Sequence, residues 1–586
     1  MVSVCPTIYV GDSAEFSEAT AVLGVPHPPG YPLYTMLGAV FVRLVRAGDF
    51  GYRANLFSAF WGAAAAAVFW VWLRRLNLGH PAALAATMTM AFGTVFWSQS
   101  VCAEVHSLNC FLFVLALLMA SVAAGHATRI WIFLSGMTVG LLVGHRNLNL
   151  LFVPAVVAPL AIRWKHLPRR QSLLAMLWFL AGGLFTAVVY AYLPVAAVHA
   201  PPLAMGAPST WARFFYVVSA HPYFRHLASA TVATSAGRFV SFVAGLPGNL
   251  GVGVIALPIG FATLLRSPDK HTLLFSVVWT AATCALFSSC YNVLDVESYF
   301  LPALIALATV SAIGFDRIGE VRALAFCLPL GALLLAVVNF SSVNLRHDRI
   351  GRSYGEDMLR STPLDAILLS FGDTSTHLLW FLQDVEGQRP DVVVVSVDEI
   401  SEWYVEKLVQ RPGVDWPSMD QTSEWLSDLV TRNLHGRKIC LTQPVGMGPP
   451  EWEPMPNGLV FCLGEQATRE SAVAASLRFW NAAGRPTPGA TVHGDVHVKM
   501  AAFSYAMARY SLLRLLISMD NEADARTQAA ALLASNPDQL EAEIASALAS
   551  VDKRLFQRFD FGAHAQKLLS MTKWDRSTLL GLFDLQ

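Results

Sequence analysis

Ten long apolar stretches fill most of residues 1–344, and they constrain the fold more than any other feature of the sequence. A helix needs about 20 apolar residues to cross a bilayer, within a range of roughly 17–25. Most of the stretches meet this length, and two are short enough to be uncertain. The pattern predicts a polytopic α-helical membrane protein with spans near 54–73, 82–101, 108–125, 130–144, 148–162, 172–198, 239–265, 272–289, 299–315 and 322–341.

Charged residues divide the chain into two parts. They make up 14% of the 586 residues, against about 25% in an average soluble domain. Residues 1–344 hold 18 Lys and Arg and 10 Asp and Glu, whereas residues 345–586 hold 23 and 31. The composition excludes a disordered chain, a nucleic-acid binder that relies on bulk positive charge, and an ordinary cytosolic enzyme.

Basic residues lie in every second connection between the predicted spans, namely at 74–75, 129, 163–170, 266–270 and 317–322. Because cytoplasmic loops are enriched in Lys and Arg, we place these connections inside. The alternate connections and the polar part after residue 341 then face outside. Residues 31–46 are apolar, and we interpret them as an interfacial or partly inserted helix that does not cross.

Carboxylates from distant positions gather at the predicted outer ends of the spans: Asp12, Glu15, Glu104, Asp295 and Glu297. Acidic side chains near a bilayer are costly, so their convergence on one face indicates a site. The competing interpretation is that they are solvated residues of outer loops. Asp12 and Glu15 are three residues apart, which fits one face of a helix and equally fits a capping box.

Histidines and one arginine accompany these acids. His27 lies in the turn HPPGYP, which can hold it near a headgroup or simply start a helix. His106 follows Glu104 at a span end, and His145 precedes Arg146 at another. Arginine suits a phosphate because it binds bidentately, although Arg146 could instead pair with an acid.

A further motif, YNVLDVESYFLP, carries Asp295, Glu297 and Tyr299. These residues could meet a polyhydroxylated ligand, or the tyrosines could form an interfacial aromatic belt.

The motifs, taken in order, resemble those of a known family. They are GDSAEF, HPPGYPLY, WSQ-x-x-x-AEVH, GHRN, YLP at 192–194, GAPSTW, YN-x-x-D-x-ESYFLP and the long segment 371–397. This set is similar to the domain-of-unknown-function 2723 family, glycosyltransferase family 117, which includes the transmembrane O-mannosyltransferases. The resemblance covers roughly residues 7–410.

The resemblance implies a GT-C type membrane glycosyltransferase. Such enzymes pass a sugar, here expected to be mannose-like, from a polyprenyl-phosphate donor to an outer-face hydroxyl of a protein or glycan acceptor, with inversion. Asp12 matches the expected base and Glu15 the second acid of the motif. Arg146 would hold the phosphate, while Glu104 and His106 would shape the phosphate or acceptor site. Asp295, Glu297 and Tyr299 would face the sugar.

The same resemblance leads us to expect no tightly bound cofactor and no assigned metal ligands. The expected setting is the bacterial inner membrane, with the C-terminal domain extracytoplasmic. Family members usually carry one more transmembrane helix before the first motif. This sequence starts almost at the motif, so we expect either a longer natural chain or a shortened enzyme with Asp12 on a loosely held end. His106 stands where the family has Tyr, and GHRN replaces a GNH arrangement.

The polar part predicts an α/β domain followed by helices. Apolar runs at 366–371, 392–397, 438–443 and 459–463 alternate with helical stretches, and Cys440 and Cys462 could pair outside the cytoplasm. Our predicted division is a first outer loop with an acidic motif and interfacial helix at 1–53, a transmembrane domain at 54–344, an extracytoplasmic α/β domain at 345–465 and a helical region at 466–586. A transporter or flippase of lipid-linked sugars and a truncated, non-catalytic relative are the alternative functions.

Overall fold

The computed structural model describes residues 2–126, 128–293, 295–418, 425–445, 453–463, 468–482 and 495–535. Contacts divide the chain into two compact units. The first comprises Met1–Tyr9 and Ser13–Asp348, and the second comprises Val10–Asp12 and Arg349–Gln586. In the sequence, the change from few to many charged residues falls at residue 344, four residues before this division.

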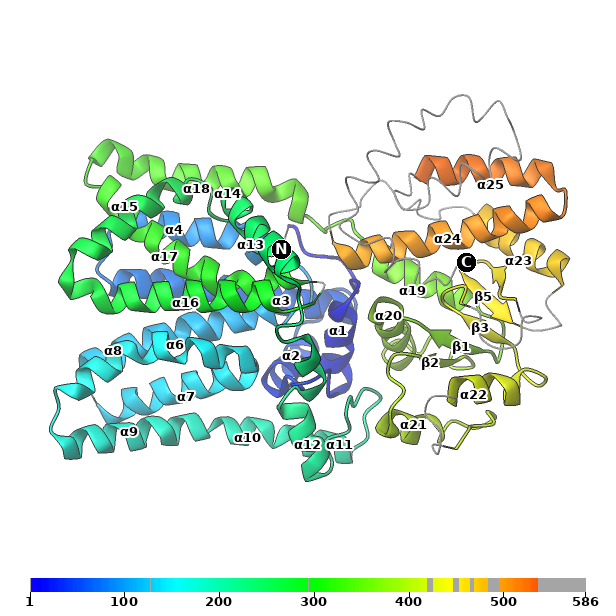
Figure 1. Cartoon of the computed structure of the whole chain (residues 1–586), viewed down its shortest axis with the longest axis horizontal. Coiled ribbons are helices and arrows are strands. Elements are labelled where there is room, and N and C mark those ends of the chain that lie inside the picture. Colours follow the sequence, from blue (N-terminus) through cyan, green and yellow to red (C-terminus); the bar gives the residue numbers. More distant parts are fainter. Residues whose placement is uncertain are drawn as a thin grey trace. The chain divides into compact units, whose positions relative to one another are not determined.

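The first unit is a bundle of helices (Figure 1). Among its described residues, six helical stretches are long and apolar enough to cross a membrane: Phe50–Arg75, His106–His126, Asn147–Lys165, Arg169–Val198, Pro268–Cys290 and Val296–Ile318. The chain is therefore a multi-pass integral membrane protein. The elements are α1 Asp12–Val22, α2 Pro32–Leu44, α3 Phe50–Arg75, α4 His80–Phe92, α5 Thr94–Ser98, α6 His106–His126, α7 Arg129–His145, η1 Asn147–Phe152, α8 Val153–Lys165, α9 Arg169–Leu184, α10 Thr186–Tyr190, α11 Tyr192–Val198, α12 Trp211–Val218, η2 His221–His226, α13 Val232–Ala244, α14 Leu246–Leu250, α15 Gly253–Arg266, η3 Pro268–Lys270, α16 His271–Cys290, η4 Val296–Phe300, α17 Leu301–Ile318 and α18 Arg322–Val343.

Helix α17 forms the centre of this bundle, whereas the stretch α9–α11 lies at its periphery. In the most apolar window of Val296–Ile318, 89% of the residues are buried, against 11% for Arg169–Val198. Both stretches are strongly apolar, so the difference reflects position and not composition. The exposed face of α9–α11 is apolar, as a surface that meets lipid must be.

Two of the predicted spans are divided into helices that are each too short to count among these six stretches. The run 82–101 is divided at Gly93 into α4 and α5, and the run 239–265 is divided into α13, α14 and α15. Gly251 has a φ of 49°, which interrupts the second run with a conformation that favours glycine. At Gly93 the backbone of Asn249 approaches so closely that a Cβ would lie 2.6 Å from its carbonyl oxygen.

Two asparagines satisfy the backbone groups that these interruptions release. The Asn249 side-chain oxygen accepts from Val95 N at 3.0 Å. Asn339 on α18 donates to the carbonyls of Phe92 and Gly248, both at 2.8 Å. Unpaired backbone groups are costly away from water, so these bonds make the two interruptions tolerable inside an apolar bundle.

The segment before Asp12 is buried and firmly attached, which corrects our expectation of a loosely held end. Cys5 and Ile8 are fully buried. Asn55 on α3 donates to the carbonyls of Cys5 and Thr7, at 2.9 and 2.7 Å. The segment therefore packs against α3 and fixes the start of α1.

Helix α2 within 31–46 has 13 residues, about 20 Å at 1.5 Å per residue, which is too short to cross the roughly 30 Å core of a bilayer.

The second unit is an α/β domain with helices, as predicted. Its sheet has the order β2-β1-β3-β5-β4, with β1 parallel to β2 and β3 and the remaining pairs antiparallel. Strand β4 is absent from the prediction. The elements are α19 Ile350–Ser361, β1 Ile367–Ser370, α20 Asp373–Asp384, β2 Val393–Ser396, α21 Glu402–Leu408, α22 Trp425–Asn433, β3 Ile439–Leu441, β4 Met455–Asn457, β5 Val460–Leu463, α23 Arg469–Asn481, α24 Val496–Ser518 and α25 Glu522–Ser535.

Strands β3 and β5 place Cys440 directly opposite Cys462, and the two sulfurs form a disulfide. This confirms the pairing that the sequence allowed. A helical region was predicted over 466–586. Helices α23, α24 and α25 lie in its described part, and residues 466–467, 483–494 and 536–586 lie outside the described residues.

Arg389 joins two parts of the second unit. Its guanidinium donates to the carbonyls of Leu359, Thr362 and Pro363 and makes a two-point contact with the Asp391 carboxylate, at 2.9 and 2.7 Å. The hydrogen bond from Arg389 lowers the pKa of Asp391 to about 2. This contact therefore ties the end of α19 to the start of β2.

The Asp391–Arg389 contact predicts an acid-sensitive stability of the second unit. A depressed carboxylate pKa stabilises the fold above the ordinary value of 3.8, and this contribution is lost as the pH falls toward about 2. Asp391→Asn should remove that part of the acid dependence. Hydrogen exchange of peptides covering α19 and β2 between pH 5 and pH 2.5 measures it; an unchanged profile in the variant would contradict the assignment.

Glycines allow α7 and α9 to pack with their backbones in contact (Figure 1). A Cβ on Gly136 would overlap the carbonyl oxygen of Phe179, and one on Gly182 would overlap that of Phe133. Close approach through small residues is the usual basis of helix association in membranes.

Gly136→Ala should therefore lower the melting temperature of the purified protein, with an overpacking cost of about 1–3 kcal/mol. Gly237→Ala on α13 is the matched control, because a Cβ there meets nothing within 4 Å. Tryptophan fluorescence during heating in detergent measures both. Equal melting temperatures of the two variants would contradict the proposed α7–α9 contact.

Candidate functional site

The predicted site residues lie at one end of the membrane helices. Helix α6 begins at His106 and helix α7 ends at His145, while the basic connection at Arg129 joins their other ends. Tyr299 precedes α17, whose opposite end carries Arg317. The structure thus separates the candidate site from the basic connections by the length of a helix. This agrees with the sequence, in which basic residues lie only in every second connection between the predicted spans.

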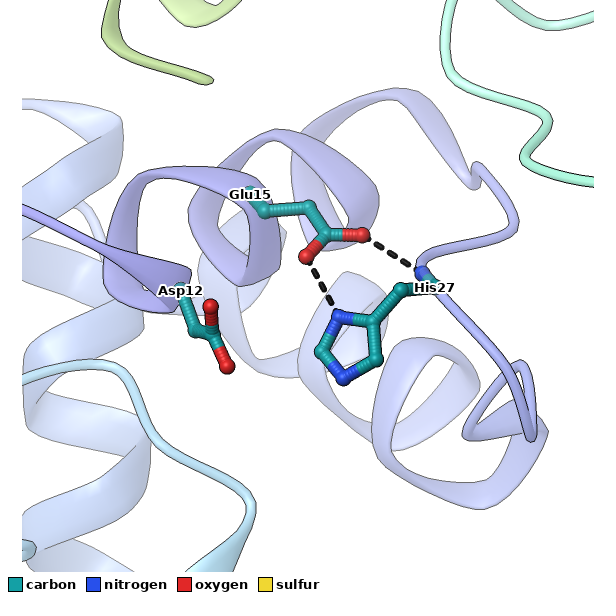
Figure 2. A group of neighbouring side chains, drawn as sticks. All are labelled: Asp12, Glu15 and His27. Atoms are coloured by element: carbon teal, nitrogen blue, oxygen red, sulfur yellow. Dashed lines mark hydrogen bonds and ion pairs between the residues drawn. The ribbon is translucent and has the colours of Figure 1, made fainter. Parts of the chain in front are cut away.

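Three of the predicted residues form the first cluster, shown in Figure 2: Asp12, Glu15 and His27. The Glu15 side chain is fully buried, and its carboxylate accepts from the His27 backbone N at 2.5 Å and from His27 Nδ1 at 2.6 Å. Asp12 begins α1 and is partly exposed. Glu15 therefore does more than a capping residue would, because it fixes both the backbone and the ring of His27.

Arg146 is the centre of the second cluster. Its guanidinium lies 4.2 Å from the centre of the Tyr299 ring and donates to His106 Nδ1 at 2.9 Å. Arginine has no acceptor, so His106 Nδ1 contributes its lone pair and His106 is neutral. Arg146 is only 7% exposed, and among the described residues it forms no ion pair with a carboxylate. A buried cation without an anionic partner is costly.

His145 adds a second buried polar group to this cluster. Its Nε2 lies 3.0 Å from the carbonyl oxygen of Val105, and a carbonyl can only accept, so Nε2 carries the proton. Among the described residues, the remaining nitrogen, Nδ1, has no hydrogen-bond partner. The cluster therefore offers a cation and a lone pair to a ligand that carries both negative charge and a donor.

Tyr31 joins the two clusters. Its ring makes edge contacts with His27 at 5.4 Å and with His145 at 5.7 Å between ring centres. Tyr31 is also the residue before α2, where the turn HPPGYP ends. The turn thus positions two rings, although the sequence suggested a role only for His27.

The remaining predicted residues flank these clusters. The backbone of Glu104 is held by the Ser58 hydroxyl, which accepts from Glu104 N at 2.9 Å and donates to Glu104 O at 3.1 Å. Asp295 and Glu297 are exposed at the start of η4. The negative charge of Asp295 acts on Arg146 and on Tyr299 in the second cluster, although its side chain is exposed. A role for Asp295 or Glu297 in sugar binding stays a prediction.

Two further residues at the site escaped the sequence analysis. Arg238 on α13 donates to the carbonyls of Tyr291 and Val293, at 2.6 and 3.1 Å, and so anchors the loop before η4. Tyr223 on η2 lies 5.9 Å from the His27 ring centre. No motif marks either residue, because both lie far along the chain from the groups that they contact.

Within the described part of the chain, one group of side chains could hold a metal ion. It is the first cluster, in which one ligand atom from each of Asp12, Glu15 and His27 lies within 4.8 Å of the others. The carboxylate of Glu15 already accepts from His27 with both oxygens. A metal would have to replace part of this bonding.

Comparison with known families supports an O-mannosyltransferase-like family. Residues 12–170 match a model described as the Protein O-mannosyl-transferase TMEM260 N-terminal domain. Residues 351–423 match TMEM260-associated domain 2. The first match begins at Asp12 and includes His27, His106 and Arg146. Membership of the domain-of-unknown-function 2723 family and of glycosyltransferase family 117, which the sequence motifs suggested, stays a prediction.

Two relatives carry the same name. The chain is 29% identical to the Protein O-mannosyl-transferase TMEM260 of Mus musculus over 442 residues, covering 68% of this chain and 61% of that protein. It is 26% identical to Protein O-mannosyl-transferase tmem260 of Dictyostelium discoideum over 106 residues, covering 18% of this chain and 13% of that protein. The chain thus spans less than two thirds of the length of both relatives.

Two crystal structures of ArnT from Cupriavidus metallidurans are similar at low identity. The form bound to undecaprenyl phosphate has a TM-score of 0.46 at 15% identity and covers 75% of this chain and 90% of that one. The apo form has a TM-score of 0.47 at 14% identity and covers 79% and 95%.

The contact between Arg146 and Tyr299 yields a testable prediction. Tyr299→Leu should lower the melting temperature, because a cation over an aromatic face contributes about 0.5–2 kcal/mol. Tyr299→Phe keeps the face and should melt close to the wild type. Similar melting temperatures for the Leu and Phe variants would show that the ring does not stabilise the cation.

Proposed function

We propose that this protein is a GT-C type membrane glycosyltransferase. It transfers a sugar, mannose by analogy with the named relatives, from a polyprenyl-phosphate donor to an acceptor hydroxyl, with inversion at the anomeric carbon. The observation that carries the proposal is Arg146, a buried cation that forms no ion pair with a described carboxylate and lies at the helix ends where the acids gather. The matches to O-mannosyltransferase domains support the same reaction class.

The phosphate of the donor would bind Arg146. A phosphate is already a good leaving group, so the main requirement is stabilisation of the charge that develops when the glycosidic bond breaks. His145 Nδ1, which lacks a described partner, would accept a hydrogen bond from a sugar hydroxyl or a protonated phosphate oxygen. Because Arg146 is 7% exposed, the phosphate reaches it only when a neighbouring ring moves.

Asp12 would remove the proton of the acceptor hydroxyl. It is the more exposed acid of the first cluster, while Glu15 is buried. A positioned base contributes about 10²–10⁴-fold to the rate. The apolar outer surface of the helices would hold the prenyl chain, as a lipid-linked donor requires.

The site end of the helices would face the outside of the bacterial inner membrane. The opposite end carries the basic connections, and cytoplasmic loops are the ones enriched in Lys and Arg. The acceptor would then be a protein or glycan hydroxyl outside the cytoplasm. The Cys440–Cys462 disulfide agrees with this placement, because disulfides persist in oxidising compartments.

One observation favours a second function, translocation of lipid-linked sugars. Transporters often bind substrate where paired helices are interrupted, and the interruptions at Gly93 and Gly251 are connected through Asn249 and Asn339. Their released backbone groups are satisfied by these asparagines. The acids and Arg146 lie instead at the helix ends, which favours transfer.

Substitution of Asp12 tests the proposed base. In liposomes supplied with polyprenyl-phosphate [³H]mannose and a threonine-containing peptide, Asp12→Asn should reduce labelling of the peptide by about 100-fold or more. Asp269→Asn is the matched control, because Asp269 lies in η3 at the opposite helix end. Full labelling by Asp12→Asn would contradict the assignment, and lipid-sugar translocation without transfer by the wild type would favour the second function.

A further inference from the structure

The connection 199–238 joins α11 to α13 at the site end of the membrane helices (Figure 1). It contains three arginines and three histidines but no Asp or Glu. The stretch before it, α9–α11, has an exposed apolar surface, and α13 after it exposes Val232, Phe239 and Val240. Helices whose surfaces suit lipid therefore bound the connection on both sides.

Helix α12, within this connection, is apolar on both its inner and its outer side. On the inner side, Val217 is fully buried in a cluster with Val25 and Leu193. On the outer side, Trp211 and Phe215 are 77% and 61% exposed, and their rings stack with 6.0 Å between centres. A surface helix in water usually carries polar side chains on its outer side. The outer side of α12 is therefore suited to a less polar medium than water.

Exposed rings continue from α12 into η2. Tyr216 and Phe224 are both exposed, and the His221 ring lies 5.3 Å from each of them between ring centres. We call the exposed side chains of Trp211, Phe215, Tyr216 and Phe224 the α12–η2 surface. A continuous exposed apolar surface marks an interaction site, and Trp and Tyr are concentrated where a membrane meets water.

Arg225 places a cation beside this surface. It is exposed, and its Nε donates to His226 Nε2 at 3.2 Å. Among the described residues it forms no ion pair with a carboxylate. Since the connection has no acid of its own, the guanidinium can bind an external anion, and its shape suits a phosphate.

We propose that the α12–η2 surface lies in the bilayer interface of the leaflet at the site end of the helices, where its rings contact lipid and Arg225 binds the phosphate groups of anionic lipids. A basic segment with Trp and Phe on its apolar side binds in this plane. The lipid-facing helices before and after the connection hold it at this depth. The inference goes beyond the proposed function, because it does not depend on sugar transfer.

The same segment is attached to the candidate site through its backbone. Asn147, the residue after Arg146, donates to the carbonyl of Val218 at 2.9 Å. The backbone N of Asn292 donates to the carbonyl of His226 at 3.1 Å. The α12–η2 surface would thus bring lipid headgroups to the end of the helices where the candidate site lies.

Photocrosslinking in nanodiscs tests the contact with lipid. The discs contain equal amounts of phosphatidylcholine and phosphatidylglycerol, and each lipid in turn carries a diazirine near its glycerol. Peptide mass spectrometry of the wild type should locate crosslinks within residues 211–226. Leu364, which is 79% exposed in the α/β domain, is the comparison for an exposed apolar side chain. Its peptide should react much less.

Arg225→Gln tests the charge. In the wild type, residues 211–226 should react more with the phosphatidylglycerol probe than with the phosphatidylcholine probe. The variant should lose about fivefold of this preference, because one arginine near an anionic surface contributes about that factor. Arg225→Lys is the matched control, since it keeps the charge and should keep the preference.

Three results would overturn the inference. Crosslinks within 211–226 no more frequent than those at Leu364 would show that the surface lies outside the lipid. Crosslinks to a second copy of the chain in place of lipid would assign the surface to a dimer. An equal preference for phosphatidylglycerol in Arg225→Gln and in the wild type would show that Arg225 does not bind lipid phosphate. None of these measurements requires transfer activity, so the proposed function is tested separately.

Discussion

The guanidinium of Arg146 lies over the Tyr299 ring and donates to His106, and the rest of the candidate site is arranged around this buried cation. A charge with so little access to water must be compensated by its surroundings. Here the compensation comes from an aromatic face, a neutral imidazole and the negative charge of Asp295, which attracts the guanidinium without forming an ion pair. An anionic ligand would add the direct ion pair that no described carboxylate makes with Arg146.

The site depends equally on the way in which the helix ends are fixed. The segment before α1 is pinned by Asn55, the backbone of Glu104 by Ser58, and the loop before η4 by Arg238. Each of these residues binds main-chain carbonyl or amide groups. The acids and histidines are thereby positioned by backbone contacts from elements far apart in the sequence.

Hydropathy and β-like runs were sufficient to predict the α/β domain, the Cys440–Cys462 pair and six of the ten expected spans, which are long apolar helical stretches among the described residues. Each of these features depends on local pattern or strand register. The interruptions at Gly93 and Gly251 were not predictable in this way. Their cost is offset by Asn249 and Asn339, which approach only in the folded bundle. Apolar composition alone therefore predicted two continuous helices where the structure has interrupted ones.

The candidate site shows the same limit. Sequence motifs identified Asp12, Glu15, His27 and Arg146, but they could not show that Glu15 binds His27 or that His106 binds Arg146. Tyr31 lay within a quoted motif and was assigned only to a turn, whereas Tyr223 carried no signal. Motifs mark which residue types are present, and the pairing between them depends on tertiary contacts.

Lipid binding by Arg146 tests the central claim most directly. Native mass spectrometry of the purified protein can compare undecaprenyl phosphate with uncharged undecaprenol in the wild type, in Arg146→Met and in the control Arg74→Met at the opposite helix end. We predict that the wild type and the control prefer the phosphate by about tenfold or more, a difference of about 1.4 kcal/mol, and that Arg146→Met loses the preference. Retention of the full preference by Arg146→Met would contradict the account.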